Sequence, residues 1–184
     1  MAYRLRVSMY KTSDMSTVLT SFLLHELRSE HRATKACLER IPESLYEYKP
    51  HPTSMQLGYL VLLVAEIPVW IKHMITDGEI DFATFKHEEP KDTAGVMELF
   101  ERCVNEAEEA LLSTNDEALK SETFTLKRNG EVLYTAKKLD DIGVSLNHWV
   151  HHRGQLTVYM RLNEIAVPSI YGPSADDKTF TPPS

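Results

Sequence analysis

The sequence has few cysteines and no excess of positive charge. It contains two cysteines in 184 residues, and its 20 Lys and Arg against 27 Asp and Glu give a net charge of -7. Because a phosphate backbone needs a basic surface, this balance argues against nucleic acid as a partner. Cys37 and Cys103 stand alone in predicted helices, so we expect reduced core residues rather than a disulfide.

Long hydrophobic runs are also missing. Residues 1–20 lack the charged, apolar and small-residue segments of a secretory signal. The longest apolar run, from Leu60 to Ile71, is interrupted by Glu66 and is too short to span a bilayer. We therefore expect a cytoplasmic protein without a membrane partner.

Several catalytic patterns are absent. The sequence shows no Ser-His-Asp or Cys-His arrangement, and no Gly-rich phosphate loop accompanies Gly154. It contains no internal repeat or low-complexity tract, and its length suits one domain. Function must therefore be sought in other residues.

Four segments carry apolar residues at helical spacing. The first predicted helix begins at Asp14 or Ser16 and ends near residue 40. The second follows an N-cap at Ser54 and ends near residue 76, before a loop over 79–92. The third and fourth cover about 93–113 and 138–163. Four amphipathic helices of this length predict an all-α helical bundle.

One strand signal interrupts the helices. Two β-prone segments flank Asn129-Gly130, the preferred pair for a two-residue type I′ turn. Such a hairpin would place Arg128 opposite Glu131 and Leu126 opposite Leu133. We expect this hairpin between the third and fourth helices. We assign residues 1–13 to a flexible extension, 14–165 to the bundle and 166–184 to an irregular tail.

Histidine is concentrated in the fourth predicted helix. Three of the eight histidines, His148, His151 and His152, lie within five residues. His148 and His152 are four residues apart and share a helix face, as two ligands of one metal ion must. His151 points away from that face and is expected at the surface or in a dimer contact. Two ligands bind a metal poorly, so further ligands must come from another segment.

Three segments carry a more specific pattern. The fourth helix reads His148-x-x-x-His152-Arg153-Gly154-Gln155-Leu156 and then Tyr159-Met160-Arg161. The second reads Ser54-Met55-x-Leu57-Gly58-x-Leu60 and then Ala65-Glu66-Ile67-Pro68-x-Trp70. The last helix leads into Val167-Pro168-Ser169-Ile170-Tyr171-Gly172-Pro173-Ser174. In these residues, and over about 15–177, the chain resembles the DinB-like superfamily, whose members are small four-helix bundles that often bind a divalent metal.

The resemblance implies an up-down-down-up bundle and a three-histidine metal site. Two ligands would be His148 and His152, and the third position, on the second helix, is occupied here by Leu63. Leucine cannot donate a lone pair, so Zn²⁺ or Ni²⁺ would need water or a substitute ligand. Glu66, one turn beyond Leu63, could be that ligand. The alternative is that Glu66 packs or forms hydrogen bonds at the rim.

Two classes of function follow from the resemblance. The first is a divalent-metal-dependent transferase or hydrolase, with a metal-activated thiol or water as nucleophile and a metal site weakened at Leu63. The second is a metal-free, non-catalytic bundle that binds a small molecule in its cavity or acts through dimerisation. The resemblance also implies a homodimer. It identifies no substrate, because one fold carries many functions.

Overall fold

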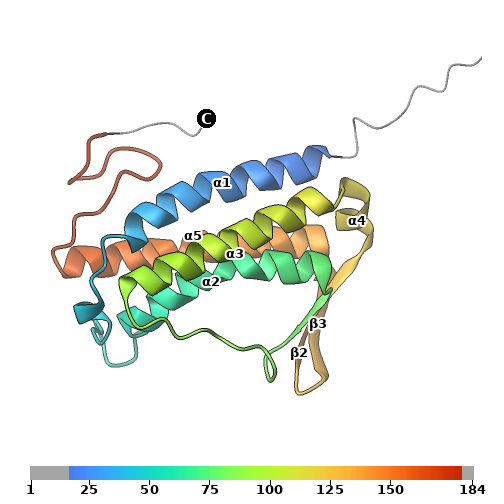
Figure 1. Cartoon of the computed structure of the whole chain (residues 1–184), viewed down its shortest axis with the longest axis horizontal. Coiled ribbons are helices and arrows are strands. Elements are labelled where there is room, and N and C mark those ends of the chain that lie inside the picture. Colours follow the sequence, from blue (N-terminus) through green and yellow to red (C-terminus); the bar gives the residue numbers. More distant parts are fainter. Residues whose placement is uncertain (1–16, 180–184) are drawn as a thin grey trace, which may run out of the picture.

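A computed structural model describes residues 17–179 of the chain. The predicted extension over 1–13 and the last residues of the predicted tail lie outside this range. The described chain is mostly helical with a small sheet (Figure 1). Its elements are α1 (Val18–Leu38), a 3-10 helix (Glu43–Leu45), α2 (Leu57–Thr76), β1 (Glu79–Asp81), α3 (Thr93–Ser113), α4 (Asp116–Ser121), β2 (Thr123–Arg128), β3 (Glu131–Lys137) and α5 (Lys138–Leu162).

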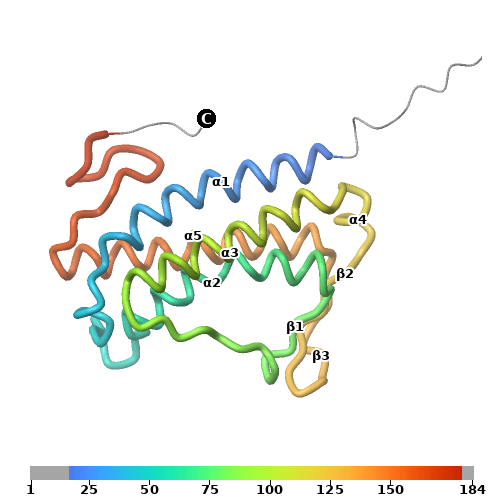
Figure 2. Tube along the Cα trace, in the orientation of Figure 1, coloured from blue at the N-terminus to red at the C-terminus, as the bar shows by residue number. Residues whose placement is uncertain are grey.

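The four long helices lie side by side along the longest axis of the molecule (Figure 1). α2 packs against α3 and α5, and α1 packs against the same two helices from the other side. The sequence colours show that α1 and α5 run in one direction and that α2 and α3 run in the other. The tail after α5 lies beside the end of α1, at the opposite end of the molecule from the β2–β3 hairpin (Figure 2).

The sheet has three strands in the order β1-β2-β3. β1 pairs in parallel with β2, in a segment where the sequence predicts a loop. At the predicted hairpin, Asn129 and Gly130 have φ values of 53° and 80°, as a type I′ turn requires. Arg128 faces Glu131 as predicted, but the prediction for Leu126 is wrong. A register shift between Leu126 and Lys127 places Tyr134 opposite Leu126.

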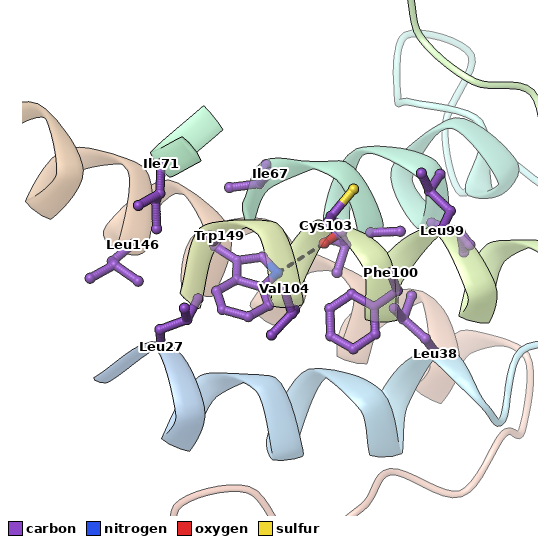
Figure 3. Packing of buried hydrophobic residues seen from close by; sticks show 14 of the residues in the cluster. Leu27, Leu38, Ile67, Ile71, Leu99, Phe100, Cys103, Val104, Leu146 and Trp149 are labelled. Atoms are coloured by element: carbon purple, nitrogen blue, oxygen red, sulfur yellow. Dashed lines mark hydrogen bonds between the residues drawn. The ribbon is translucent and has the colours of Figure 1, made fainter. Parts of the chain in front are cut away.

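The core lies between the four long helices. Trp149 of α5 is fully buried, packs against Phe100 of α3 at 6.0 Å between ring centroids, and donates from Nε1 to the Val64 carbonyl oxygen of α2 (Figure 3). Cys37 and Cys103 are buried and unpaired, which confirms the prediction of reduced cysteines. Burial raises the pKa of Cys37 to about 11 and of Cys103 to about 12, so neither is activated as a thiolate.

Helix α2 is apolar along most of its length. By length and composition alone Leu57–Thr76 could cross a membrane, and half of that window is buried inside the fold. The helix begins after Gln56, which makes no side-chain capping bond, so the predicted N-cap at Ser54 is wrong. Pro68 lies within the helix. The hydrophobicity of α2 is explained by its contacts with both α3 and α5.

Candidate metal site on α5 and α2

Two hydrogen bonds fix α5 against α2. Trp149 Nε1 donates to the Val64 carbonyl oxygen at 2.9 Å, and the Tyr159 hydroxyl donates to the Met55 carbonyl oxygen at 2.9 Å. Moving toward the end of α5 therefore means moving toward the start of α2, and the two helices are antiparallel. This register places the turn of α5 that carries His148 and His152 beside the turn of α2 that carries Leu63.

The two predicted histidine ligands converge. Nε2 of His148 and Nε2 of His152 lie 2.7 Å apart, and the ring centroids are separated by 4.5 Å. On the other side of the second ring, His152 Nδ1 lies 2.7 Å from Gln155 Oε1. Because an amide oxygen only accepts, Nδ1 of His152 carries the proton and its Nε2 presents a lone pair. Nε2 of His148 then donates to that lone pair.

Both imidazoles favour their neutral form. Partial desolvation lowers the pKa of His148, and the nearby rings of His152 and His151 lower it further. Burial likewise lowers the pKa of His152, although the hydrogen bond to Gln155 acts in the opposite direction. His152 is 6% exposed. A metal ion binds neutral imidazole, so these surroundings favour the charge state that binds metal in both rings, and His148 would bind through Nε2 only after its proton moves to Nδ1.

Gln155 contributes to this arrangement in a way that the sequence analysis missed. Its side-chain oxygen accepts from Nδ1 of His152 and holds that ring. An acceptor on the second ring nitrogen fixes the tautomer and orientation of metal-binding histidines in general. The signal was present in the sequence, since Gln155 follows His152 by three residues and so shares its helix face.

The chain has an apolar residue at the position where the resemblance implies a third ligand. Leu63 is partly buried and packs against the hydrophobic core. Glu66 is 4% exposed, and its carboxylate accepts from His87 Nδ1 at 2.6 Å and from the Glu88 backbone amide at 3.0 Å. Both partners belong to the segment between β1 and α3. Glu66 is thus tied to that segment by both of its oxygens.

The two histidines are therefore placed to bind one metal ion, but the described residues offer no complete set of ligands. Within residues 17–179, no group of three or more His, Cys, Asp or Glu is arranged to hold a metal. Two nitrogens at about 2.0–2.1 Å from a tetrahedral Zn²⁺ would be about 3.3 Å apart, so the His148–His152 pair would open by about 0.6 Å. Rotation of the exposed His148 side chain can supply such a shift.

His31 of α1 is partly buried and lies elsewhere. Its Nε2 is 3.1 Å from Glu101 Oε2 on α3, and its ring packs against Phe100. Arg153, next to His152, pairs with a carboxylate. Its carboxylate partner is the buried Glu30 of α1.

A cavity of about 490 Å³ lies apart from these residues, near the start of α2. Its volume suits a small organic ligand. It is lined by Tyr46, Glu47, Gln56, Gly58, Tyr59, Leu62, Glu89, Pro90 and Val96.

The sequence profile of the DinB family matches residues 15–183, nearly the whole chain. The chain belongs to the DinB family. This confirms the resemblance inferred from the histidine-bearing helix and the Ala65-Glu66 segment. No match was found among curated proteins.

Two crystal structures of DinB-like proteins share the fold. One, from Bacillus subtilis, is 21% identical in sequence, with a TM-score of 0.63 over 78% of this chain and 92% of that protein. The other, from Bacillus cereus, is 20% identical, with a TM-score of 0.65 over 82% of this chain and 97% of that protein. Identity at this level shows a common fold and assigns no substrate.

Proposed function

We propose that this DinB-family chain binds a divalent metal at His148 and His152 and acts as a metal-dependent transferase or hydrolase whose third protein ligand has been replaced by Leu63. The observation that carries this proposal is the convergence of the two Nε2 atoms while Gln155 holds Nδ1 of His152. Remaining coordination positions are then open to water or substrate.

A bound Zn²⁺ or Ni²⁺ would supply a nucleophile at neutral pH by lowering the pKa of a coordinated water or thiol. The residues of the chain would hold the metal and shape the site around it. His148 and His152 donate nitrogen lone pairs, Gln155 fixes the His152 tautomer, and Leu63 forms an apolar wall. Glu66 could become a ligand only by giving up His87 and the Glu88 amide.

We further propose that the four long helices form the up-down-down-up bundle of the family. The directions of the helices in Figure 1 support this order. The antiparallel contact of α2 with α5, fixed at Trp149 and Tyr159, supports it independently.

The second candidate function is a metal-free protein that binds a small molecule. The cavity near the start of α2 favours it, because its lining combines two tyrosines and two glutamates with the apolar side chains of Leu62 and Val96. The loss of a ligand at Leu63 favours it as well. In this function the histidine pair would remain a neutral, hydrogen-bonded unit.

Metal analysis of protein purified without an affinity tag tests the first proposal. We expect Zn²⁺ or Ni²⁺ to bind with a stoichiometry near one per chain when supplied in excess, measured by mass spectrometry after desalting and by titration calorimetry. His148→Ala and His152→Ala should each abolish binding. His25→Ala, at an exposed histidine of α1, is the matched control and should leave binding unchanged. Absence of binding to the unmodified chain would contradict the proposal.

A gain-of-ligand variant tests the geometry of the site. Leu63→His should raise metal affinity at least about tenfold, which corresponds to about 1.4 kcal/mol. Leu62→His places the same side chain one residue away, on the wall of the separate cavity, and should not raise affinity. Equal affinities of these two variants would show that position 63 does not face the histidine pair.

A further inference from the structure

The cavity near the start of α2 is built from segments that are far apart in the sequence. It lies at the end of the bundle opposite the β2–β3 hairpin, where the chain enters α2 and α3 (Figure 1). Its lining comes from the residues after the 3-10 helix, the start of α2, the segment before α3 and the first turn of α3. Its volume of about 490 Å³ falls within the range of about 300–1,000 Å³ that is common for small-molecule sites.

One wall of this cavity depends on Gly58. The Gly58 amide donates to the Tyr46 carbonyl oxygen at 2.8 Å, and the Leu57 amide donates to the Tyr48 carbonyl oxygen at 2.9 Å. A Cβ at Gly58 would lie 2.9 Å from the Cβ of Tyr46, which is too close for two carbon atoms. Glycine therefore lets Tyr46 lie directly on α2. The Tyr46 hydroxyl also lies 3.4 Å from Thr93 Oγ1, so this residue joins the starts of α2 and α3.

The lining carries negative charge and no positive charge. It includes two exposed carboxylates, Glu47 and Glu89, and no Lys, Arg or His. Glu47 accepts from Nε2 of Gln56, a neutral donor that leaves its charge uncompensated. Glu89 forms no hydrogen bond or ion pair with any residue of the described range 17–179. Both carboxylates are thus available to a positively charged ligand.

The surroundings of the Tyr46 wall are acidic as well. Burial raises the pKa of Tyr46, and the carboxylates of Glu43 and Asp92 raise it further, although the hydrogen bond with Thr93 acts in the opposite direction. The phenol therefore stays neutral at pH 7. An anion in the cavity would be repelled by the carboxylates around it, and a cation would be attracted.

The remaining lining is aromatic and apolar. Tyr59 is 52% exposed, and its hydroxyl makes no hydrogen bond within the described part of the chain. Leu62 is partly buried and Val96 is buried. A carboxylate binds an ammonium group through charge-assisted hydrogen bonds, and an aromatic ring attracts a cation to its face. Carboxylates beside tyrosines and apolar side chains therefore suit a ligand that has a charged end and an apolar body.

A bare metal ion fits this lining less well. Within residues 17–179, no group of three or more His, Cys, Asp or Glu is arranged to hold one. A metal ion would also leave the apolar part of the lining without a partner, whereas an organic cation covers it.

We propose that this cavity binds an organic ammonium ion, with its charged end beside Glu47 and Glu89 and its apolar body against Leu62 and Val96. The inference rests on the second candidate function, small-molecule binding, and names the ligand class. It does not depend on a bound metal, because the histidine pair does not line the cavity.

Three probes with one body and different charges test the ligand class. At pH 7, 4-phenylbutylamine is a cation, 4-phenyl-1-butanol is neutral and 4-phenylbutyrate is an anion. Each is titrated into the full chain after removal of metal by a chelator, and the amide signals are followed by nuclear magnetic resonance. We expect the amine to shift the Gly58 and Val96 amides, with a dissociation constant at least about tenfold below that of the alcohol. The anion should not bind.

The outcomes separate the ligand class from the function on which it rests. If the alcohol or the anion binds the cavity as tightly as the amine, the cavity takes small molecules but not as cations, and the proposed class is wrong. If none of the three binds, the inference fails together with the assignment of small-molecule binding to this cavity.

Carboxamide variants test the charged end of the site. The double variant Glu47→Gln and Glu89→Gln should weaken binding of 4-phenylbutylamine at least about tenfold and leave binding of the alcohol unchanged. The matched control changes the same net charge at the opposite end of the molecule, with Glu117→Gln and Glu131→Gln at exposed positions of α4 and β3. Equal losses in the two double variants would mean that overall charge, and not the cavity, attracts the amine, and would overturn the proposal.

Two further variants test the aromatic contact and the location. Tyr59→Ala should weaken amine binding at least about threefold and Tyr59→Phe should retain it, because the ring contacts the cation. His148→Ala should bind the amine as the unmodified chain does. Circular dichroism confirms that each variant is folded. Loss of amine binding in His148→Ala would place the ligand at the histidine pair and contradict the proposed site.

Discussion

Arg153 and Glu30 form an ion pair inside the molecule, where their exposed fractions are 2% and 6%. The guanidinium also lies 3.3 Å from Thr34 Oγ1 and 2.5 Å from the Tyr171 hydroxyl, which donates to both Glu30 oxygens. This network joins α1, α5 and the tail. It holds the turn of α5 that carries His152, because Arg153 is the next residue.

Removing one partner of this pair leaves the other charge buried. Glu30→Ala is expected to lower the free energy of unfolding by about 3–5 kcal/mol, since Arg153 then lacks its carboxylate. Urea denaturation followed by circular dichroism measures the loss. Arg102→Ala, which breaks exposed ion pairs with Glu88 and Glu106, is the control and should change stability little. If both variants lower the free energy of unfolding by similar amounts, burial does not increase the contribution of the Arg153–Glu30 pair to stability.

Asp141 is a buried carboxyl whose only described side-chain partner is the Tyr134 hydroxyl, at 3.0 and 3.3 Å. Burial raises the pKa of Asp141 above its ordinary value, despite the opposing hydrogen bond. It also raises the pKa of Tyr134 to about 12, so the phenol stays protonated. Because the folded pKa of Asp141 exceeds the unfolded one, its contribution favours folding below about pH 3.9 and is lost as pH rises through the folded pKa.

Asp141→Asn should therefore be more stable than the unmodified chain at pH 7, because the amide removes the buried charge and still accepts from Tyr134. The difference should shrink as the pH falls toward 4. Thermal unfolding between pH 4 and 8 measures it. Glu98→Gln, at an exposed carboxylate, should show no such trend. A difference independent of pH would mean that the carboxyl does not titrate as described.

At the scale of the elements, α1 begins with a cap from a distant helix. Asp116 of α4 accepts from the backbone amides of Leu19 and Thr20 at 3.0–3.1 Å and from the Thr20 hydroxyl at 3.0 Å. Desolvation alone would raise the pKa of Asp116, but these hydrogen bonds together lower it. The local residue Thr17 makes no side-chain capping bond.

Asp116→Ala should consequently free the first turn of α1. Hydrogen exchange of the Leu19 and Thr20 amides should accelerate, while amides in the centre of the helix keep their protection. Because the folded pKa of Asp116 is lowered, the cap is present above pH 4 and is lost as the pH falls through the folded value. Asp92→Ala removes the local cap of α3 at Gly95 and should leave the start of α1 unchanged. Unaltered exchange in Asp116→Ala would contradict this cap.

Local patterns predicted some elements better than others. The third predicted helix coincides with α3, because Asp92 and the apolar spacing after it are local signals. The hairpin turn was also predicted from local sequence, since only Asn129 and Gly130 must adopt positive φ. The register beyond the turn was not predicted: a shift after Leu126 places Tyr134 opposite it, and the Tyr134 hydroxyl also donates to Asp141 of α5. The parallel partner of β2, strand β1, lies over forty residues away and left no sequence pattern.

For the molecule as a whole, the amphipathic helices predicted a helical fold, and the histidine motif predicted the family. Tertiary structure supplied the contacts between residues far apart in the sequence. Nothing in the sequence indicated that His87 would bind Glu66, 21 residues away, or that Glu30 would be the partner of Arg153.

The sequence by itself determined the helices and turn, the family, and the placement of His148 and His152 on one face, because each depends on residues within a few positions of one another. Only the tertiary structure decided which side chains from distant segments meet: Glu66 with His87 instead of the histidine pair, Glu30 with Arg153, and Asp116 at the start of α1. Such contacts depend on the packing of distant segments, where burial requires every polar group to find a partner.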